Sequence, residues 1–155
     1  MDRKQNRATY DGPMKSVRLK DIAILEGAKK GKIYKKGCIL FWTQAGRGKN
    51  VEYLEEDTEV NERYTVAKIK KEYNSRYVFE ALTRIYPRWI HAHMQNINLP
   101  WQELYKIKLD IHEDRKTQDY VADKCKKCDE VIKTEKETLN TLEEIKKTLL
   151  KEMFV

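Results

Sequence analysis

The sequence predicts an α+β protein, with a small, mixed and mostly β domain followed by one long C-terminal α-helix. From residue 117 to residue 154, apolar or thiol side chains recur at steps of three and four without an intervening Pro or Gly. This spacing is typical of a helix with one continuous apolar seam. The residues before it instead form short apolar or alternating runs separated by turn residues. We therefore expect a basic, flexible arm at 1–15, a domain at 16–114 and a long helix at 115–155.

The composition narrows the classes of function. The chain has 155 residues, of which 37% are charged, and a formal net charge of +7, with much of the basic excess in the first half. This distribution favours a polyanionic partner over mere solubility. No stretch resembles a secretory signal or a transmembrane span, so we expect a cytoplasmic protein without a membrane partner.

Short strands make up most of the predicted domain. Residues 16–23 have the pattern of a strand that runs into one helical turn, and 38–43 form a continuous apolar run typical of a buried strand. Residues 51–54 and 59–69 are predicted strands on either side of an acidic turn at 55–57.

One amphipathic helix is predicted within the domain. Apolar residues recur at helical spacing from Asn74 to Tyr86, and we expect Pro87 to end this helix. Pro100 opens a helical turn at 101–104. The period-two alternation of 105–111 then predicts a half-buried strand.

Basic residues form the first candidate group for nucleic-acid contact. A lysine-rich loop with two glycine turns offers cations that neutralise phosphates, at Lys29, Lys30, Lys32, Lys35 and Lys36. The polar segment 44–50 adds Arg47 and Lys49, which can reach phosphates or guanine edges. An ordinary hairpin turn kept soluble by its charge explains this segment equally well.

Amide side chains form a second candidate group. Gln95, Asn96 and Asn98 have the chemistry to read adenine or to bond the DNA backbone. Turn caps are an equally good interpretation of these three residues. Arg84 and Arg88 add basic charge around the end of the predicted helix.

No residue pattern indicates catalysis, a cofactor or a metal site. Neither a nucleophile–base pair nor a cofactor fingerprint is visible in the sequence. Cys125 and Cys128 have the spacing of half a metal site, but no second pair of ligands accompanies them. Both thiols fall on the helical seam, and we interpret them as small packed hydrophobes.

The long helix is expected to need a partner helix along much of its length, because roughly 55 Å of apolar seam cannot be covered by a domain of this size. Gln118 starts the seam, and the charged Glu135 in its middle would need a cation from the partner, such as Lys133 or Lys136. The predicted interface consists of Val121, Cys125, Cys128, Ile132, Glu135, Leu139, Leu142, Leu149 and Met153.

The order of these segments resembles one half of a type I restriction–modification specificity subunit. The resemblance rests on the opening at 17–23, on the stretch 94–99 that precedes a turn and the 107–111 strand, and on the helix ending at 142–154. Gln118 early in the helix and a Gly-Arg-Gly turn before a strand also match the family. The full subunit of this family has two recognition domains and two long helices, whereas this chain has one of each.

The resemblance implies a target recognition domain that does no chemistry itself, with methyltransferase and nuclease subunits as possible partners. We therefore expect the long helices of two copies to pair as an antiparallel coiled coil, giving a homodimer that reads a bipartite palindromic site in double-stranded DNA. It would act within a restriction–modification complex, or alone as a repressor or as a factor of a plasmid, phage or other mobile element. The alternative is a non-enzymatic antagonist whose helix docks on a specificity subunit or another coiled-coil partner and whose domain reads no DNA.

Overall fold

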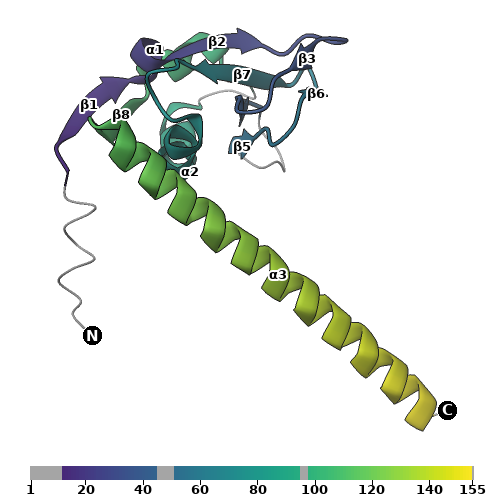
Figure 1. Ribbon diagram of the computed structural model, residues 1–155. Coiled ribbons are helices and arrows are strands. Elements are labelled where there is room, and N and C mark those ends of the chain that lie inside the picture. Colours follow the sequence, from purple (N-terminus) through teal and green to yellow (C-terminus); the bar gives the residue numbers. More distant parts are fainter. Residues whose placement is uncertain (1–11, 45–50, 95–97, 155) are drawn as a thin grey trace. The chain divides into compact units, whose positions relative to one another are not determined.

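The computed structural model describes residues 12–44, 51–94 and 98–154 (Figure 1). Its contacts divide the chain into two units, Met1–Ala122 and Asp123–Val155, so that the division falls inside the long C-terminal helix. Small antiparallel sheets are followed by that helix, which confirms the predicted α+β class.

A four-stranded antiparallel sheet is the largest sheet of the first unit. Its strand order is β2 (Ala23–Gly27), β7 (Tyr64–Ile69), β4 (Ile39–Trp42) and β5 (Val51–Tyr53). Within the β2–β7 pair, Leu25 lies opposite Ala67, and both side chains are buried in the main core. The predicted strand at 51–54 is therefore confirmed, as is the one at 38–43.

The central strand β4 is a continuous apolar run because both of its faces are buried. Neighbouring side chains of a strand point to opposite faces. Ile39 and Phe41 belong to the main core, while Leu40 packs with Tyr34 and Val66 in a second core. This arrangement explains why the strand lacks the polar alternation of a half-exposed one.

Two short two-stranded sheets complete the β structure. β1 (Met14–Arg18) pairs with β8 (Lys108–His112) and leads into the single turn of α1 (Leu19–Ile22), as 16–23 predicts. β3 (Ile33–Tyr34) pairs with β6 (Thr58–Glu59). Since Met14 and Lys15 belong to β1, the predicted flexible arm is too long at its C-terminal end; residues 1–11 lie outside the described ranges.

Two predicted strands have different bounds in the structure. The single strand expected at 59–69 is interrupted after β6 by a turn, in which the Tyr64 N–H donates to the Asn61 carbonyl at 3.0 Å. The strand expected at 105–111 begins late, because the 3₁₀ helix η1 (Trp101–Lys106) continues through Lys106. Leu104 and Ile107 are fully buried, and their burial favours this tighter turn over an extended start.

Helix α2 (Ser75–His93) passes through Pro87, so the prediction that Pro87 ends the helix is wrong. A proline inside a helix loses one backbone hydrogen bond and costs about 3 kcal/mol. Contacts on both sides of it offset this cost. Tyr86 is fully buried and its hydroxyl donates to the Trp42 carbonyl at 3.0 Å, and Trp89 packs against the main core beyond the proline.

Helix α3 (Arg115–Met153) confirms the predicted long helix. Asp114 caps its N-terminus, since the N–H and the hydroxyl of Thr117 donate to the Asp114 carboxylate at 2.9 and 3.0 Å. Gln118 is only 1% exposed. It is buried in the first unit, so this seam position does not belong to the exposed part of the helix.

Candidate nucleic-acid interface

Turns on both sides of β3 position the lysine-rich segment. Gly31 and Gly37 have φ values of 76° and 89°, which other residues rarely adopt. The Gly31 N–H donates to the Glu59 carboxylate at 2.7 Å, and the Gly37 N–H donates to the Leu54 carbonyl at 2.8 Å. The two glycine turns expected from the sequence are therefore present, and the segment between them is held against β6 and the end of β5.

The five lysines of this segment fall into two classes. Lys32 pairs with Glu26 and Lys35 with Asp57, each at 2.6 Å. These hydrogen bonds raise the pKa of both ammonium groups, and the Lys35 contact lowers the pKa of Asp57. Lys29, Lys30 and Lys36 are exposed and form no ion pair with another described residue. These three ammonium groups can bind phosphate without first breaking an ion pair.

A basic groove of about 330 Å³ lies beside β3. Lys32, Lys35 and Lys36 line it together with Lys68 of β7. Lys68 is not among the contact residues predicted from the sequence, although a lysine in an otherwise apolar strand indicates an outward-facing position. Ile24 and Ile33 contribute exposed apolar surface to the same groove, with 60% and 65% of their surface accessible.

The two polar segments 45–50 and 95–97 are bordered by residues that we call their stems, and these stems meet beyond the C-terminal end of β4. Gln44 and Asn98 form an isolated antiparallel bridge, and the Leu99 N–H donates to the Thr43 carbonyl at 2.9 Å. The predicted contact residues Arg47, Lys49, Gln95 and Asn96 lie outside the described residues, whereas Asn98 is exposed. The structure thus brings together two segments that are far apart in the sequence.

The lysine groove and these stems lie at opposite ends of β4. Cys38, which lines the groove, directly precedes the strand, and Thr43 directly follows it. A four-residue strand spans about 13 Å, at about 3.3 Å per residue. The groove and the bridge between Gln44 and Asn98 are therefore separated by the length of this strand.

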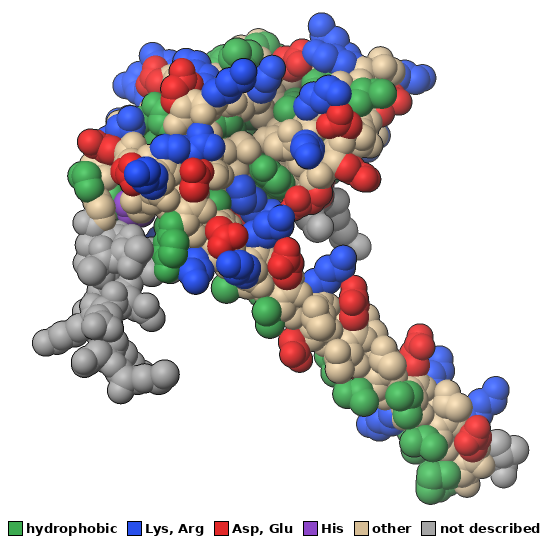
Figure 2. Space-filling model, viewed as in Figure 1, with side chains coloured by type: hydrophobic (Ala, Val, Ile, Leu, Met, Phe, Trp, Pro, Cys, Tyr) green, Lys and Arg blue, Asp and Glu red, His purple; other side chains and the backbone are tan. Residues whose placement is uncertain are grey.

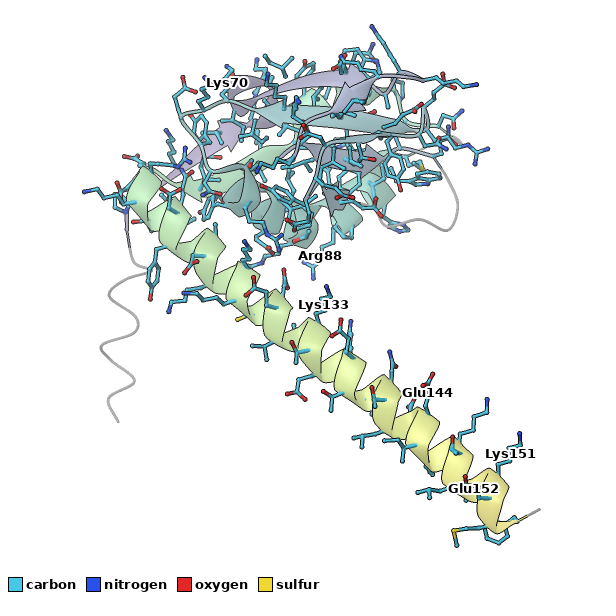
Figure 3. All side chains as sticks on the ribbon, turned by 45° about the vertical axis from the view of Figure 1, so that its right-hand side comes forward. Lys70, Arg88, Lys133, Glu144, Lys151 and Glu152 are labelled. Carbon is cyan, nitrogen blue, oxygen red and sulfur yellow. The ribbon has the colours of Figure 1, made fainter. Side chains whose placement is uncertain are left out.

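The predicted arginines lie on α2 and form a separate group. Arg84 and Arg88 are both exposed, and Arg88 lies in the turn after Pro87 (Figure 3). Arg84 lines a different hollow, which it shares with Met14 and Asp110. None of the predicted lysines lines that hollow. The sequence does not reveal this separation, because it depends on which side of α2 covers the sheet.

The second unit carries most of the predicted seam. Apolar side chains gather along one side of its helix (Figure 2), and Ile132, Leu139 and Leu142 are 51–57% exposed. Figure 3 shows Lys133, Glu144 and Lys151 pointing to another side. The remaining predicted interface residues of this unit, all exposed except the half-buried Cys125, are Cys125, Cys128, Glu135, Leu149 and Met153. Val121 belongs to the first unit, where it packs against the main core.

The described residues hold no cluster of three or more His, Cys, Asp or Glu side chains that could bind a metal ion. Cys38 is buried, and burial raises the pKa of its thiol, so it is a poor nucleophile. No helix among these residues combines the length and the apolar character needed to cross a membrane.

Comparisons with known proteins find solved structures with a similar fold but no match to a family model or a curated protein. The chain is similar to the S subunit of the type I restriction–modification system from M. genitalium, with a TM-score of 0.73 and 16% identity over 97% of this chain and 48% of that one. It is also similar to a chain from a structural study of complex assembly and conformational transition in the type I R-M system. That match has a TM-score of 0.65 and 10% identity over 83% of this chain and 42% of the other.

The chain spans about half the length of the solved structures that it matches. At these identities the likeness concerns the fold. It agrees with the resemblance that the segment order indicates: in fold, the chain resembles half of a type I restriction–modification specificity subunit, a target recognition domain with one long helix.

Proposed function

We propose that this chain is a non-enzymatic, sequence-specific double-stranded DNA-binding protein that works as half of a type I specificity subunit. The observation that supports this proposal most strongly is the fold match to an S subunit over 97% of the chain. The net charge of +7 and the exposed lysines of the first unit agree with a polyanionic ligand.

In this proposal the basic groove and the lysines that precede β3 contact the DNA backbone. Lys29, Lys30 and Lys36 bind phosphates directly, and Lys32 and Lys35 do so by exchanging their carboxylate partners for phosphate oxygens. The two polar segments with their stems, which carry Arg47, Lys49, Gln95, Asn96 and Asn98, read the bases. Arg84 and Arg88 are secondary backbone contacts.

Two copies pair through the seam of α3 to form an antiparallel homodimer. Fully burying an exposed Leu or Ile side chain contributes about 1.5–3 kcal/mol. Covering side chains such as Leu139 and Leu142, which are already half buried, contributes part of this free energy for each residue. A two-fold dimer presents two identical domains, which suit a bipartite palindromic site. Type I methyltransferase and nuclease subunits are the protein partners expected for such a dimer in the cytoplasm.

Selection of bound duplexes from a random pool, followed by fluorescence anisotropy across salt concentrations, tests the proposal. We expect a bipartite palindrome. The plot of log affinity against log salt has a negative slope. The variant Lys29→Gln/Lys36→Gln should make this slope less steep by roughly 0.9 for each phosphate that the protein no longer neutralises. The matched control Lys147→Gln/Lys151→Gln removes the same charge from α3 and should leave the slope close to that of the wild type. Equal slopes for all three proteins would contradict the assignment of these lysines to the DNA backbone.

A second candidate function is a non-enzymatic antagonist that docks α3 on another protein's coiled coil. The pairing of Lys32 and Lys35 with Glu26 and Asp57 favours it, because these ion pairs reduce the attraction for phosphate. This alternative predicts no enrichment of any duplex in the selection, together with binding of α3 to a specificity subunit. Enrichment of a palindrome would exclude it.

A further inference from the structure

We infer, on the basis of the proposed function, that His93 at the end of α2 reads one base pair of each half-site. Its ring accepts a hydrogen bond from the exocyclic amine of adenine or cytosine in the major groove. The sequence alone singles out none of the three histidines. The structure does, because His93 is exposed and its ring is held in one orientation by a stack and a hydrogen bond.

A row of aromatic rings runs from the main core to His93. Phe41 and Tyr86 are fully buried and meet edge to face, with ring centroids 5.1 Å apart. The half-buried Trp89 stacks on Tyr86 with a centroid distance of 6.1 Å. The exposed His93 ring stacks on Trp89 in turn, with centroids 4.3 Å apart and 12° between the ring planes. The His93 ring is therefore supported from the core outward, although it lies at the surface.

A hydrogen bond sets which nitrogen of the His93 ring is free. The Nδ1 atom lies 2.8 Å from the Trp89 carbonyl, one helical turn earlier. A carbonyl can only accept a hydrogen bond, so Nδ1 carries the proton. In the neutral ring the other nitrogen, Nε2, is then an acceptor. His93 therefore offers an acceptor in a fixed orientation at the surface of the first unit.

The position of His93 agrees with a role in reading bases. Helix α2 ends at His93, and the predicted contact residues Gln95 and Asn96 follow almost directly in the sequence. The Tyr86 hydroxyl donates to the Trp42 carbonyl at 3.0 Å, which ties the row of rings to the C-terminal end of β4. The stems of both polar segments meet beyond that same end. We expect DNA bound by these segments to pass beside His93.

An acceptor in this place distinguishes base pairs by their pattern in the major groove. The exocyclic amines of adenine and cytosine donate there, whereas O6 of guanine and O4 of thymine only accept. A neutral Nε2 atom attracts the amines and repels the carbonyl oxygens. His93 should therefore favour A or C over G or T at one position of one strand in each half-site.

Duplex selection with His93→Phe tests this assignment, because phenylalanine keeps a ring that stacks on Trp89 and lacks the nitrogen. The selections are made at pH 8, where histidine side chains are neutral. At one position of each half-site, the wild type should prefer A or C and the variant should show no such preference. All other positions should be the same for the two proteins.

His91→Phe is the matched control. His91 is also exposed and lies in the same last turn of α2, but its side chain makes no hydrogen bond or ring contact in the part of the chain that the structure describes. This variant should select the same sequence as the wild type. Loss of the same base preference in His91→Phe would overturn the assignment to His93.

Base analogues then identify the atom that His93 contacts. Purine in place of adenine, or 2-pyrimidinone in place of cytosine, removes the exocyclic amine at the selected position. The analogue should weaken binding of the wild type about fivefold more than binding of His93→Phe, which corresponds to one hydrogen bond. An equal loss for both proteins would show that another residue contacts the amine.

The outcomes separate failure of this inference from failure of the proposed function. A wild type that enriches no duplex contradicts the proposed function itself. If the wild type enriches a bipartite palindrome and His93→Phe shows the same preference at every position, the role of His93 is overturned and DNA recognition still stands. An equal loss of affinity for all duplexes would also overturn this role, because a purely structural stack affects binding without changing base preference.

Discussion

At the scale of single residues, Gln118 shows how a polar side chain acquires a structural role. Its Nε2 group donates to the His112 carbonyl at 2.8 Å, and its Oε1 atom accepts from the Asn74 N–H at 3.0 Å. One side chain thus joins the end of β8, the start of α2 and the first turns of α3. Tyr77 supports the same point, because its hydroxyl accepts from the His112 N–H at 3.0 Å.

Removing this amide should be costly. Gln118→Ala leaves the part-buried Asn74 N–H and the buried His112 carbonyl without this partner, and each unsatisfied buried group costs about 1–3 kcal/mol. We expect the free energy of unfolding, measured by urea denaturation at fixed protein concentration, to fall by about 2–4 kcal/mol. Gln102→Ala, at an exposed glutamine of η1, serves as the control and should change it by less than about 0.5 kcal/mol. Equal values for the two variants would refute the role of Gln118.

At the scale of elements, the N-terminal cap of α3 makes helix stability depend on pH. Hydrogen bonds from the Thr117 backbone and side chain lower the pKa of Asp114. The pKa is lower in the folded state than the usual value of about 3.9 in the unfolded state. The contribution to stability is therefore fully present above that value and is lost as the pH falls through the folded pKa.

Asp114→Asn keeps an oxygen acceptor at the cap and removes the charge. We expect its melting temperature to lie below that of the wild type at pH 6 and to approach it as the pH falls through the folded pKa of Asp114, which lies below about 3.9. Thermal unfolding followed by circular dichroism at pH 6 and at a series of acidic pH values measures the difference. A gap that stays constant with pH would show that the charge of Asp114 does not matter.

Patterns within one element were sufficient to predict most of the helices and strands. The seam of α3 and the apolar run of β4 follow directly from residue spacing. The passage of α2 through Pro87 does not, because the contact that anchors Tyr86 comes from Trp42, which is distant in the sequence. Local helix propensity includes the cost of the proline but not the packing that offsets this cost.

The candidate interface could be predicted only as a set of residue types. Sequence placed the lysines around β3 on one basic segment, but it could not show that Glu26 and Asp57 pair with two of them. It also could not bring Lys68 of β7 to the same groove. These are contacts between strands, and their partners are set by register rather than by neighbouring residues.

At the scale of the whole molecule, the proposed dimer makes the length of α3 a measure of distance along DNA. In the proposed antiparallel pair, lengthening α3 would move the two copies of the domain further apart. The spacing between half-sites should follow the number of residues in α3.

Inserting one heptad, duplicated from residues 133–139, tests this relation while keeping the seam in phase. Seven residues add about 10 Å of helix, which corresponds to about three base pairs. Duplex selection should return the same two half-sites with about three more base pairs between them. As a control, inserting five residues throws the seam out of phase and should weaken the dimer. An unchanged spacing for the heptad variant would mean that α3 does not set the distance between the two recognition domains.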